Sequence, residues 1–162
     1  MAERPIRLFG DPVLRTSCDA VDKFDDALIS LVTDLEETVS APGRAGLAAN
    51  QIGVSRRVFA HDVDGQGGHV VNPVIEAIEG EQEDEEGCLS IPGLWYPLQR
   101  AQYARVRGVD RSGQPVVIES EGLLARCTQH EVDHLNGRLF VDRLSGSARK
   151  QAMRDLRERY TS

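Results

Sequence analysis

The sequence predicts an α+β fold, in which helices and antiparallel hairpins share one domain. Apolar residues recur at helical spacing over residues 25–39 and 121–135, which indicates two amphipathic helices. Two further segments, residues 57–71 and 101–120, carry β-rich runs on either side of a glycine-containing turn, which indicates hairpins. The chain has 162 residues, so we expect a single domain over residues 1–162.

The composition excludes several classes of protein. Hydrophobic residues make up 40% and charged residues 28%, and no apolar run is long enough to span a bilayer, so no membrane partner is expected. The first residues lack the apolar core of a secretory signal and the three cysteines cannot all pair, which favours a cytoplasmic protein. A net charge of -7 argues against a surface that binds nucleic acid as a whole.

The N-terminal third contains a short helical turn and one long helix. Asp11 before Pro12 is a cap residue followed by a first-turn proline, so a helical turn is expected there. The long helix follows Asp25 or Asp26 as its cap and ends before Pro42. Its predicted core face consists of Leu28, Leu31, Val32, Leu35 and Val39.

Residues 43–53 are small and apolar but end in two amides. Small residues such as Gly46 would let a ligand or another backbone approach closely, and Gln51 offers an amide donor. From the residues alone we favour a tight loop in which Gln51 satisfies nearby backbone groups.

The middle of the chain predicts two hairpins separated by an acidic turn. The first joins residues 57–63 to 69–71 and continues through Asn72-Pro73, and His61 and His69 beside its turn are expected to be surface residues. The acidic run at 79–86 is expected to be a solvated turn. The second hairpin joins residues 101–110 to 114–120.

The helix at 121–135 carries the chemistry of the chain. His130 and His134 are four residues apart, so their rings share a helix face with Cβ atoms roughly 6 Å apart. A bare pair of this kind is usually a pair of boundary histidines on an amphipathic helix. Glu131 between them gives His-Glu-x-x-His, in which two histidines bind a metal and the glutamate acts as a base. The motif requires a third ligand.

Cys88 and Cys127 compete for the place of third ligand. Cys127, His130 and His134 form a line about 10 Å long on the helix, whereas ligand bonds measure only about 2–2.3 Å. Cys88 comes from a distant loop, can approach across the helix face, and leaves a fourth position open for water. We therefore predict Cys88, His130 and His134 as metal ligands and Cys127 as part of the adjacent pocket wall. Taken alone, a cysteine in the setting of Cys88 is more commonly a buried structural residue.

Three segments together resemble the peptide deformylases: Gly46-Leu47-Ala48-Ala49-Asn50-Gln51, Glu86-Gly87-Cys88-Leu89-Ser90 and Gln129-His130-Glu131-Val132-Asp133-His134. The resemblance implies antiparallel sheets packed around the central helix with a further helix at the C-terminus. It implies that Cys88, His130 and His134 hold Fe(2+), for which Zn, Ni or Co could substitute. It also implies that Gln51 and the Leu89 backbone NH steady an oxyanion, and that Glu86 and Arg100 support a ligating histidine.

The activity implied is removal of the formyl group from the formyl-methionine of nascent peptides, with release of formate. The metal would lower the pKa of its bound water, Glu131 would take the proton, and the hydroxide would attack the formyl carbon. Gly46, Gly87 and Leu89 would wall the formyl site. The methionine pocket would be built from Gly46, Leu123, Cys127 and His130. Arg44 and Trp95 depart from the expected pattern near the pocket entrance.

Two other readings stay open from the residues. A metallopeptidase would use the same His-Glu-x-x-His motif, but its third ligand is commonly a downstream His or Glu. A metal-stabilised binding module would need four ligands and has no use for Glu131 as a base.

The segment from Arg143 to Tyr160 is a basic island on an acidic protein, with an apolar stripe that predicts a C-terminal helix. It is either a surface helix packed on the domain or, as the resemblance suggests, a ribosome-docking element. Truncation after Ser145 would then weaken co-sedimentation with ribosomes at low salt.

Overall fold

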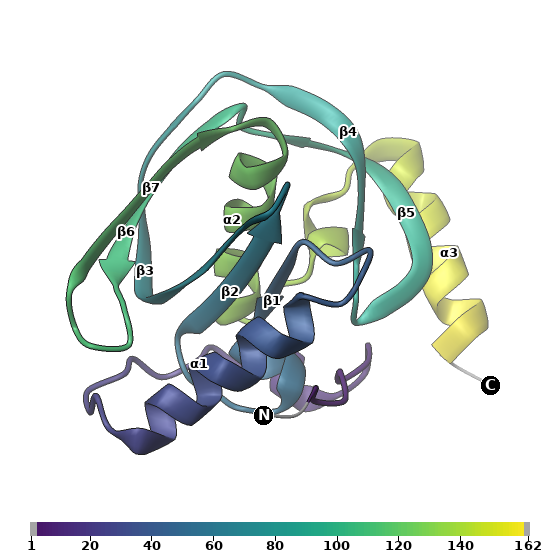
Figure 1. Ribbon diagram of the computed structural model, residues 1–162. Coiled ribbons are helices and arrows are strands. Elements are labelled where there is room, and N and C mark those ends of the chain that lie inside the picture. The colour runs from purple at the N-terminus through teal and green to yellow at the C-terminus, as the bar shows by residue number, and fades with distance from the viewer. Residues whose placement is uncertain (1–2, 161–162) are drawn as a thin grey trace.

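Helix α2 (Gly122–Leu135) lies at the centre of the molecule, and two antiparallel sheets surround it (Figure 1). The computed structural model describes residues 3–160. The larger sheet has the strand order β1-β2-β3-β6-β7, and the smaller one pairs β4 with β5. The strands are β1 (Gly46–Ala48), β2 (Val58–Val63), β3 (Gln66–Glu79), β4 (Gln82–Cys88), β5 (Ile91–Arg100), β6 (Tyr103–Val109) and β7 (Pro115–Glu121). The predicted α+β class is confirmed.

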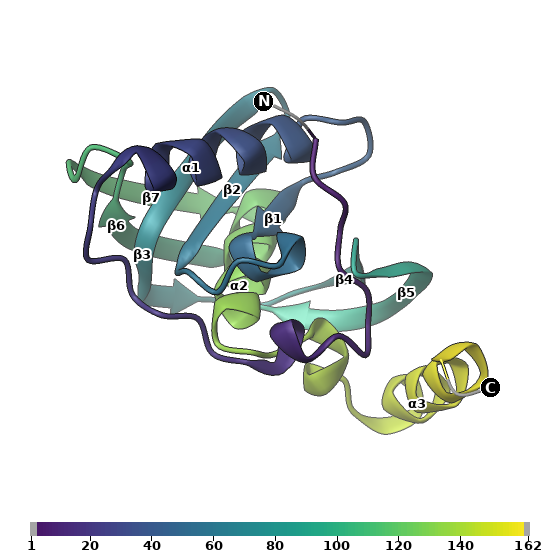
Figure 2. The same cartoon turned by 90° about the horizontal axis from the view of Figure 1, so that it is seen from below.

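Helix α1 (Asp26–Val39) forms where the apolar spacing predicts it. Asp25 is its N-cap, and the side chain of Asp25 accepts a hydrogen bond from the Leu28 backbone NH, which satisfies one of the free donors at the helix start. The apolar face of α1 packs on β2 through Val58 and Ala60, whereas Phe59 between them packs with residues of α2. Because neighbouring strand residues face opposite sides, α1 and α2 cover opposite faces of the larger sheet (Figure 2).

Helix α2 is buried over most of its length, since every residue from Ala125 to Leu135 is buried. Its polar motif therefore lies inside the protein, where unpaired polar groups are costly and ionised groups need partners. Asn136 is the C-cap, and Gly137 follows with φ of 76°, a backbone conformation that glycine adopts without steric cost. A Cβ on Gly137 would also lie 2.8 Å from the Arg15 carbonyl oxygen.

The β4–β5 hairpin corrects the prediction for the acidic run. Residues 82–88 are strand β4 rather than a solvated turn. They pair with β5 from Gln82 opposite Arg100 to Glu86 opposite Tyr96, and after a shift of register Cys88 lies opposite Ile91. Pro92 and Gly93 belong to β5, although a Pro-Gly pair is typical of turns, and the turn lies at Leu89 and Ser90. The hairpin exists because pairing with β5 supplies hydrogen-bond partners to a segment whose acidic side chains do not favour a strand.

Residues 43–53 also differ in part from the predicted tight loop. Gly46–Ala48 form β1 at the edge of the larger sheet, and Ala49–Ile52 form the short 3-10 helix η2. The predicted function of Gln51 in the loop reading is nevertheless present, because its side-chain oxygen accepts a hydrogen bond from the Ala48 backbone NH at 3.0 Å.

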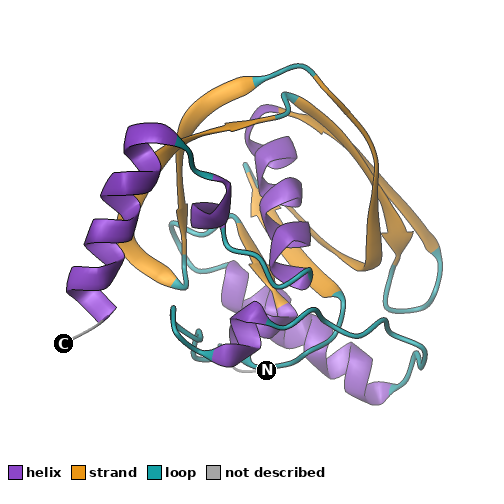
Figure 3. Cartoon of the chain, turned by 180° about the vertical axis from the view of Figure 1, so that it is seen from behind, coloured by secondary structure: helices purple, strands orange, loops and turns teal. Residues whose placement is uncertain are grey.

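The remaining helices, one near the N-terminus and two near the C-terminus, contribute to one apolar cluster. Helix η1 (Pro12–Arg15) has Asp11 as its N-cap, as predicted, and η3 (Phe140–Arg143) leads into α3 (Gly146–Tyr160). Figure 3 shows α3 alongside β5, where Ala152 and Leu156 are buried in a cluster with residues of β5 and η3. Within residues 3–160, no helix combines the length and apolar composition needed to cross a membrane.

Candidate metal centre

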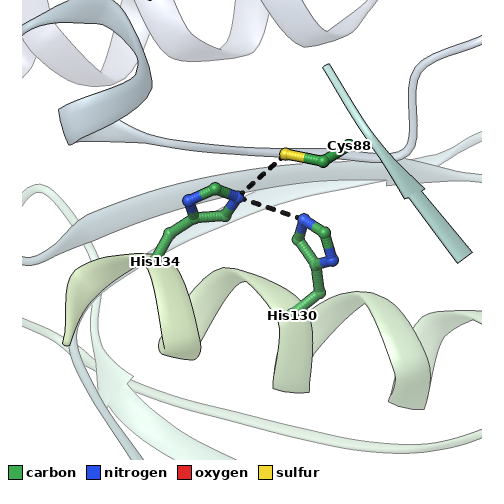
Figure 4. Close-up of side chains that lie close together, drawn as sticks. All are labelled: Cys88, His130 and His134. Carbon is green, nitrogen blue, oxygen red and sulfur yellow. Dashed lines mark hydrogen bonds between the residues drawn. The ribbon is translucent and has the colours of Figure 1, made fainter. Parts of the chain in front are cut away.

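Three side chains that could bind one metal ion meet between α2 and the β4–β5 turn. The ligand atoms of Cys88, His130 and His134 all lie within 4.8 Å of one another (Figure 4). Cys88 Sγ is 3.3 Å from His134 Nε2, which is 3.1 Å from His130 Nε2. The structure therefore brings together the three residues predicted as ligands, and it keeps Cys127 apart with its thiol near the Ala45 carbonyl oxygen at 3.5 Å.

The local structure explains this convergence. The two histidines project from one face of α2 because they are four residues apart, and Cys88 reaches them from the last position of β4. The Ser90 backbone NH donates to Cys88 Sγ at 3.4 Å, which holds the sulfur in place beside the histidines.

Glu86 orients His130. Its Oε2 lies 2.7 Å from His130 Nδ1, and its two oxygens also accept hydrogen bonds from Arg100 at 3.0 and 2.6 Å and from Arg126 at 2.8 Å. Burial raises the pKa of Glu86, but hydrogen bonds from His130 and Arg100 outweigh burial and hold that pKa well below its usual range. Glu86 is thus a carboxylate that accepts a hydrogen bond from the Nδ1–H of His130, which leaves Nε2 facing Cys88 and His134.

His134 is held differently. Its backbone carbonyl accepts a hydrogen bond from the Asn50 side chain at 2.6 Å, and its Nδ1 has no hydrogen-bond partner among the described residues. Burial, together with the charge of His130, lowers the pKa of His134 well below its usual value. The ring is therefore neutral, which is the form of histidine that ligates metals.

This donor set fits a divalent transition metal. One thiolate and two imidazole nitrogens are a common protein ligand set for such ions, and three protein ligands leave a coordination position open, as catalytic sites require. The Glu86 hydrogen bond fixes the orientation of the His130 ring, and burial keeps His134 neutral, so both residues direct Nε2 toward the same point, where a bound metal would replace any Nε2 proton of His130.

Glu131 lies beside the three ligand residues with an oxygen that no described residue binds. It is 3% exposed, and its Oε1 has no hydrogen-bond partner among residues 3–160. Burial raises the pKa of Glu131 to about 7, although the charge of His130 opposes this. The carboxyl group can therefore both accept and release a proton near neutral pH.

Gln51 aims its amide NH2 at the same place. Its Nε2 donates to Ser90 Oγ at 3.1 Å and lies 3.7 Å from Cys88 Sγ, while its Oε1 is held by the Ala48 backbone NH. The amide orientation is fixed by these two contacts, so Gln51 presents a donor, and not an acceptor, to the centre.

A cleft of about 560 Å³ opens onto the centre. Its lining contains all the residues predicted for the substrate pocket, for the oxyanion and for the general base: Gly46, Gln51, Gly87, Leu89, Leu123, Cys127, His130 and Glu131. Trp95 also lines it, is 60% exposed, and packs so closely on Gly87 that a Cβ there would lie 2.6 Å from the indole ring. Arg44 lines the entrance, and its guanidinium donates to the Thr38 carbonyl oxygen at 2.7 Å.

The prediction for the other two histidines was wrong. His61 is only 8% exposed, because it lies under Gly68 in the β2–β3 hairpin. His69 is half-buried, its Nδ1 lies 3.1 Å from a Glu36 oxygen, and its Nε2 accepts a hydrogen bond from the Arg111 backbone NH. These contacts come from α1 and the β6–β7 turn, which sequence spacing does not reveal.

Several residues of the site were not identified from the sequence. Ser90 accepts a hydrogen bond from Gln51, and Asn50 donates one to the His134 carbonyl oxygen at the end of α2. Arg126 donates to Glu86, and Asp133 accepts from Arg100. The sequence predicts an amphipathic helix here, so Arg126 and Asp133 could pass for solvated residues, whereas the structure buries both and therefore requires partners for their charges.

Comparison with known proteins identifies relatives over almost the whole chain. The model of a protein family described as "Polypeptide deformylase" matches residues 3–150. A peptide deformylase of Acidothermus cellulolyticus is 58% identical over 159 residues, which cover 98% of this chain and 88% of the relative. Peptide deformylase 1 of Corynebacterium glutamicum is 50% identical over 158 residues, with 94% of each chain covered.

Solved structures give the same result for the fold. The crystal structure of a peptide deformylase from Legionella pneumophila is similar to this chain with a TM-score of 0.89 and 44% sequence identity, and the match covers 97% of this chain and 95% of that one.

Proposed function

Because this chain belongs to the polypeptide deformylase family, we propose that it is a metal-dependent hydrolase that removes the formyl group from the N-terminal formyl-methionine of new polypeptides and releases formate. The observation that carries this proposal is the cluster of Cys88, His130 and His134 at the base of a cleft, with Glu131 and Gln51 beside it. One catalytic domain that spans residues 1–162 is part of the proposal.

Cys88, His130 and His134 would hold the metal, and we propose Fe(2+) as the native ion with Zn, Ni or Co as possible substitutes. When bound, the metal supplies a Lewis acid that acidifies water and polarises a carbonyl oxygen. Glu86 would keep His130 in the ligating tautomer, and Arg100 would keep Glu86 charged and oriented.

Glu131 would act as the general acid and base. With a pKa of about 7 it takes a proton from the attacking water and then returns a proton to the departing amine nitrogen. The Gln51 amide NH2 and the Leu89 backbone NH would donate to the formyl oxygen as negative charge develops on it. Since Ser90 and Ala48 already fix the Gln51 amide, little reorganisation is needed during the reaction.

The size of the acyl group would be limited by the walls of the cleft. Gly46 approaches Glu131 so closely that a Cβ there would lie 2.6 Å from its Oε2, which leaves little room beside the base. Gly87 and Leu89 close the other side of the centre. The methionine side chain would occupy the part of the cleft lined by Leu123 and Cys127.

The test is formate release from a formyl-methionyl peptide by the Fe(2+)- or Ni(2+)-loaded protein, with a Glu131→Gln variant. General acid–base catalysis is worth about 10²–10⁴-fold, so we expect kcat/KM to fall by at least about 100-fold while bound metal is retained. Glu83→Gln, an exposed change on β4, is the matched control and should leave activity unchanged. Equal rates for the wild type and Glu131→Gln would contradict the proposal.

We further propose a cytoplasmic enzyme that docks on the ribosome through α3. Arg149, Lys150 and Arg154 on this helix are exposed, while Tyr96 anchors its inner side by a 2.7 Å hydrogen bond to Asp155. Replacement of those three basic residues by glutamine should weaken co-sedimentation with ribosomes and reduce its salt dependence, since fewer phosphate contacts release fewer counterions. Unchanged sedimentation at low salt would count against docking through this face.

A further inference from the structure

A chain of buried ion pairs runs from His130 to the segment that precedes α3. Glu86 binds His130, Arg100 binds Glu86, Asp133 binds Arg100, and Arg143 of η3 binds Asp133. Glu86, Arg100 and Asp133 are 4–5% exposed, so each of these charges depends on its neighbours in the chain for stabilisation.

Asp133 accepts hydrogen bonds from two arginines, Arg143 and Arg100. Arg143 donates to both of its oxygens, from Nε to Oδ2 at 2.5 Å and from Nη2 to Oδ1 at 2.8 Å, and Arg100 Nη1 donates to Oδ2 at 2.8 Å. A two-pronged contact of this kind fixes the plane of the carboxylate as well as its position. The orientation of Asp133 is therefore set mainly by Arg143.

Arg100 is shared between the two carboxylates. Its Nε and Nη2 donate to Glu86, and its Nη1 donates to Asp133. Because the guanidinium is planar and rigid, rotation of Asp133 would tilt the whole group relative to Glu86. Glu86 in turn sets the ring orientation of His130 through Nδ1.

Arg143 is the outer and accessible member of this chain. Its side chain is 45% exposed, and it lines a second cavity of about 400 Å³ together with Arg100, Gln129 and Asp133. Arg143 does not line the substrate cleft. A change at the Arg143 side chain can therefore reach His130 through the ion pairs without altering the residues that line the cleft, and Phe140 of η3, which stacks on the His130 ring, stays in place.

We propose that Arg143 is a positioning residue for the metal centre, which holds Asp133 and Arg100 in the arrangement that keeps Glu86 on His130. Without Arg143, the buried Asp133 would keep Arg100 as a partner and would turn toward it. Asp133 would then draw Arg100 away from Glu86, which would keep only Arg126 as an arginine partner, and the Glu86–His130 contact would loosen. The inference rests on the proposed function only in assuming that His130 is a metal ligand.

The experiment compares the wild type with Arg143→Ala, Arg143→Lys and Arg138→Ala. Arg138 is an exposed arginine in the connection between α2 and η3, five residues before Arg143. Its replacement is therefore a matched loss of one surface arginine. Three quantities are measured: the Co(2+) dissociation constant by competition with a chelator, the visible absorption spectrum of the Co(2+)-loaded protein, and kcat and KM separately. The first two do not require any catalytic activity.

For Arg143→Ala we expect Co(2+) to bind roughly threefold to tenfold more weakly, below the 10–100-fold typical when a direct partner of a ligand is removed. The Co(2+) spectrum should change, and kcat should fall by a similar factor with KM unchanged. Arg143→Lys keeps a positive charge beside Asp133 and should therefore recover part of the metal affinity. Arg138→Ala should match the wild type.

A purely structural role would lower the melting temperature of Arg143→Ala and leave the Co(2+) affinity and spectrum as in the wild type, and this result would overturn the inference. So would an equal loss of affinity in Arg138→Ala. If the wild type binds Co(2+) but releases no formate, the proposed function fails. The Co(2+) affinity and spectrum of Arg143→Ala then still decide whether Arg143 positions the metal centre.

Discussion

At the scale of single residues, the centre depends on close approaches that only small side chains permit. Gly46 shows this most clearly, because a Cβ at this position would lie 2.6 Å from both Cys127 Sγ and Glu131 Oε2. Both neighbours are buried in α2 and cannot move into solvent. The backbone of β1 can therefore lie against Glu131 only because residue 46 has no side chain.

We therefore expect Gly46→Ala to displace Glu131 and to lower kcat by on the order of 10- to 100-fold, since a shift of about 1 Å in a catalytic group can cost 10²-fold. The measurement is steady-state formate release with bound metal quantified in parallel. Gly67→Ala is the control, because its Cβ would meet the His61 carbonyl oxygen at an ordinary 3.5 Å. An alanine variant with wild-type kcat would show that Glu131 has more freedom than these distances allow.

Ser90 is the second residue whose contribution is positional. Its hydroxyl accepts the Gln51 Nε2 hydrogen bond at 3.1 Å, and both residues are buried. Ser90→Ala should leave the amide donor free to rotate, so kcat should fall with little change in KM. The unfolding free energy should drop by about 1–3 kcal/mol, the usual cost of a buried donor that loses its partner. Kinetics and denaturant titration measure the two effects, and an unchanged kcat would place the Gln51 amide outside the reaction.

At the scale of elements, the helices were predictable and one hairpin was not. Helices α1 and α2 are encoded locally: Asp25 caps one, Asn136-Gly137 ends the other, and apolar spacing marks both faces. The bounds predicted from those signals differ from the observed ones by about one residue. Such signals need no knowledge of the rest of the fold.

Strand β4 could not be predicted in the same way. Its sequence, Gln82-Glu83-Asp84-Glu85-Glu86, is rich in residues that are depleted in strands. It becomes a strand because β5 pairs with it and because Arg100 and Arg126 neutralise Glu86 inside the protein. Those partners lie 14 and 40 residues away in sequence, so no local pattern reports them.

Strand β3 offers a test of how an irregular strand position is stabilised. Asn72 has φ of 53°, and its side chain forms two hydrogen bonds with the Val21 backbone, at 2.8 and 2.9 Å. Asn72→Ala should lose both bonds and should tolerate the left-handed region less well, because alanine lacks the polar side chain that lets asparagine adopt it. We expect a loss of about 2–4 kcal/mol in unfolding free energy, from two hydrogen bonds and a left-handed penalty of roughly 1–2 kcal/mol.

Asn72→Gly separates the two contributions in the same denaturation experiment. Glycine loses the hydrogen bonds but tolerates the backbone angle, so this variant should be more stable than Asn72→Ala. If alanine and glycine are equally destabilising, the left-handed conformation carries no cost at this position.

At the scale of the whole molecule, the sequence indicated the parts of the site but not what holds them. The spacing of His130 and His134 predicts a shared face, and the collinearity of Cys127 with them points to a distant third residue. The ion pairs from Glu86 to Arg143 join β4, β5, α2 and η3, and they depend on the tertiary arrangement alone. The same holds for the packing of α3 on β5 through Tyr96 and Asp155.

Metal binding should stabilise the fold, because the proposed ligands come from two different elements. Cys88 lies at the end of β4 and the histidines lie on α2, so a shared ion would cross-link the smaller sheet to the central helix. An ion that binds the native state alone adds about 2.7 kcal/mol to the unfolding free energy at 100 times its dissociation constant. Chelation should therefore lower the melting temperature, and Ni(2+) or Co(2+) should restore it.

Cys88→Ser is the variant that tests this expectation, because it keeps the shape of the β4–β5 turn and removes the thiolate. Its melting temperature should match that of the chelated wild type and should respond only weakly to added metal. Cys18→Ser, a change at a buried thiol outside the centre, should lower stability by itself but keep the full metal-dependent increase. A metal-dependent shift in Cys88→Ser as large as in the wild type would mean that Cys88 is not a ligand, whatever its distance from the two histidines.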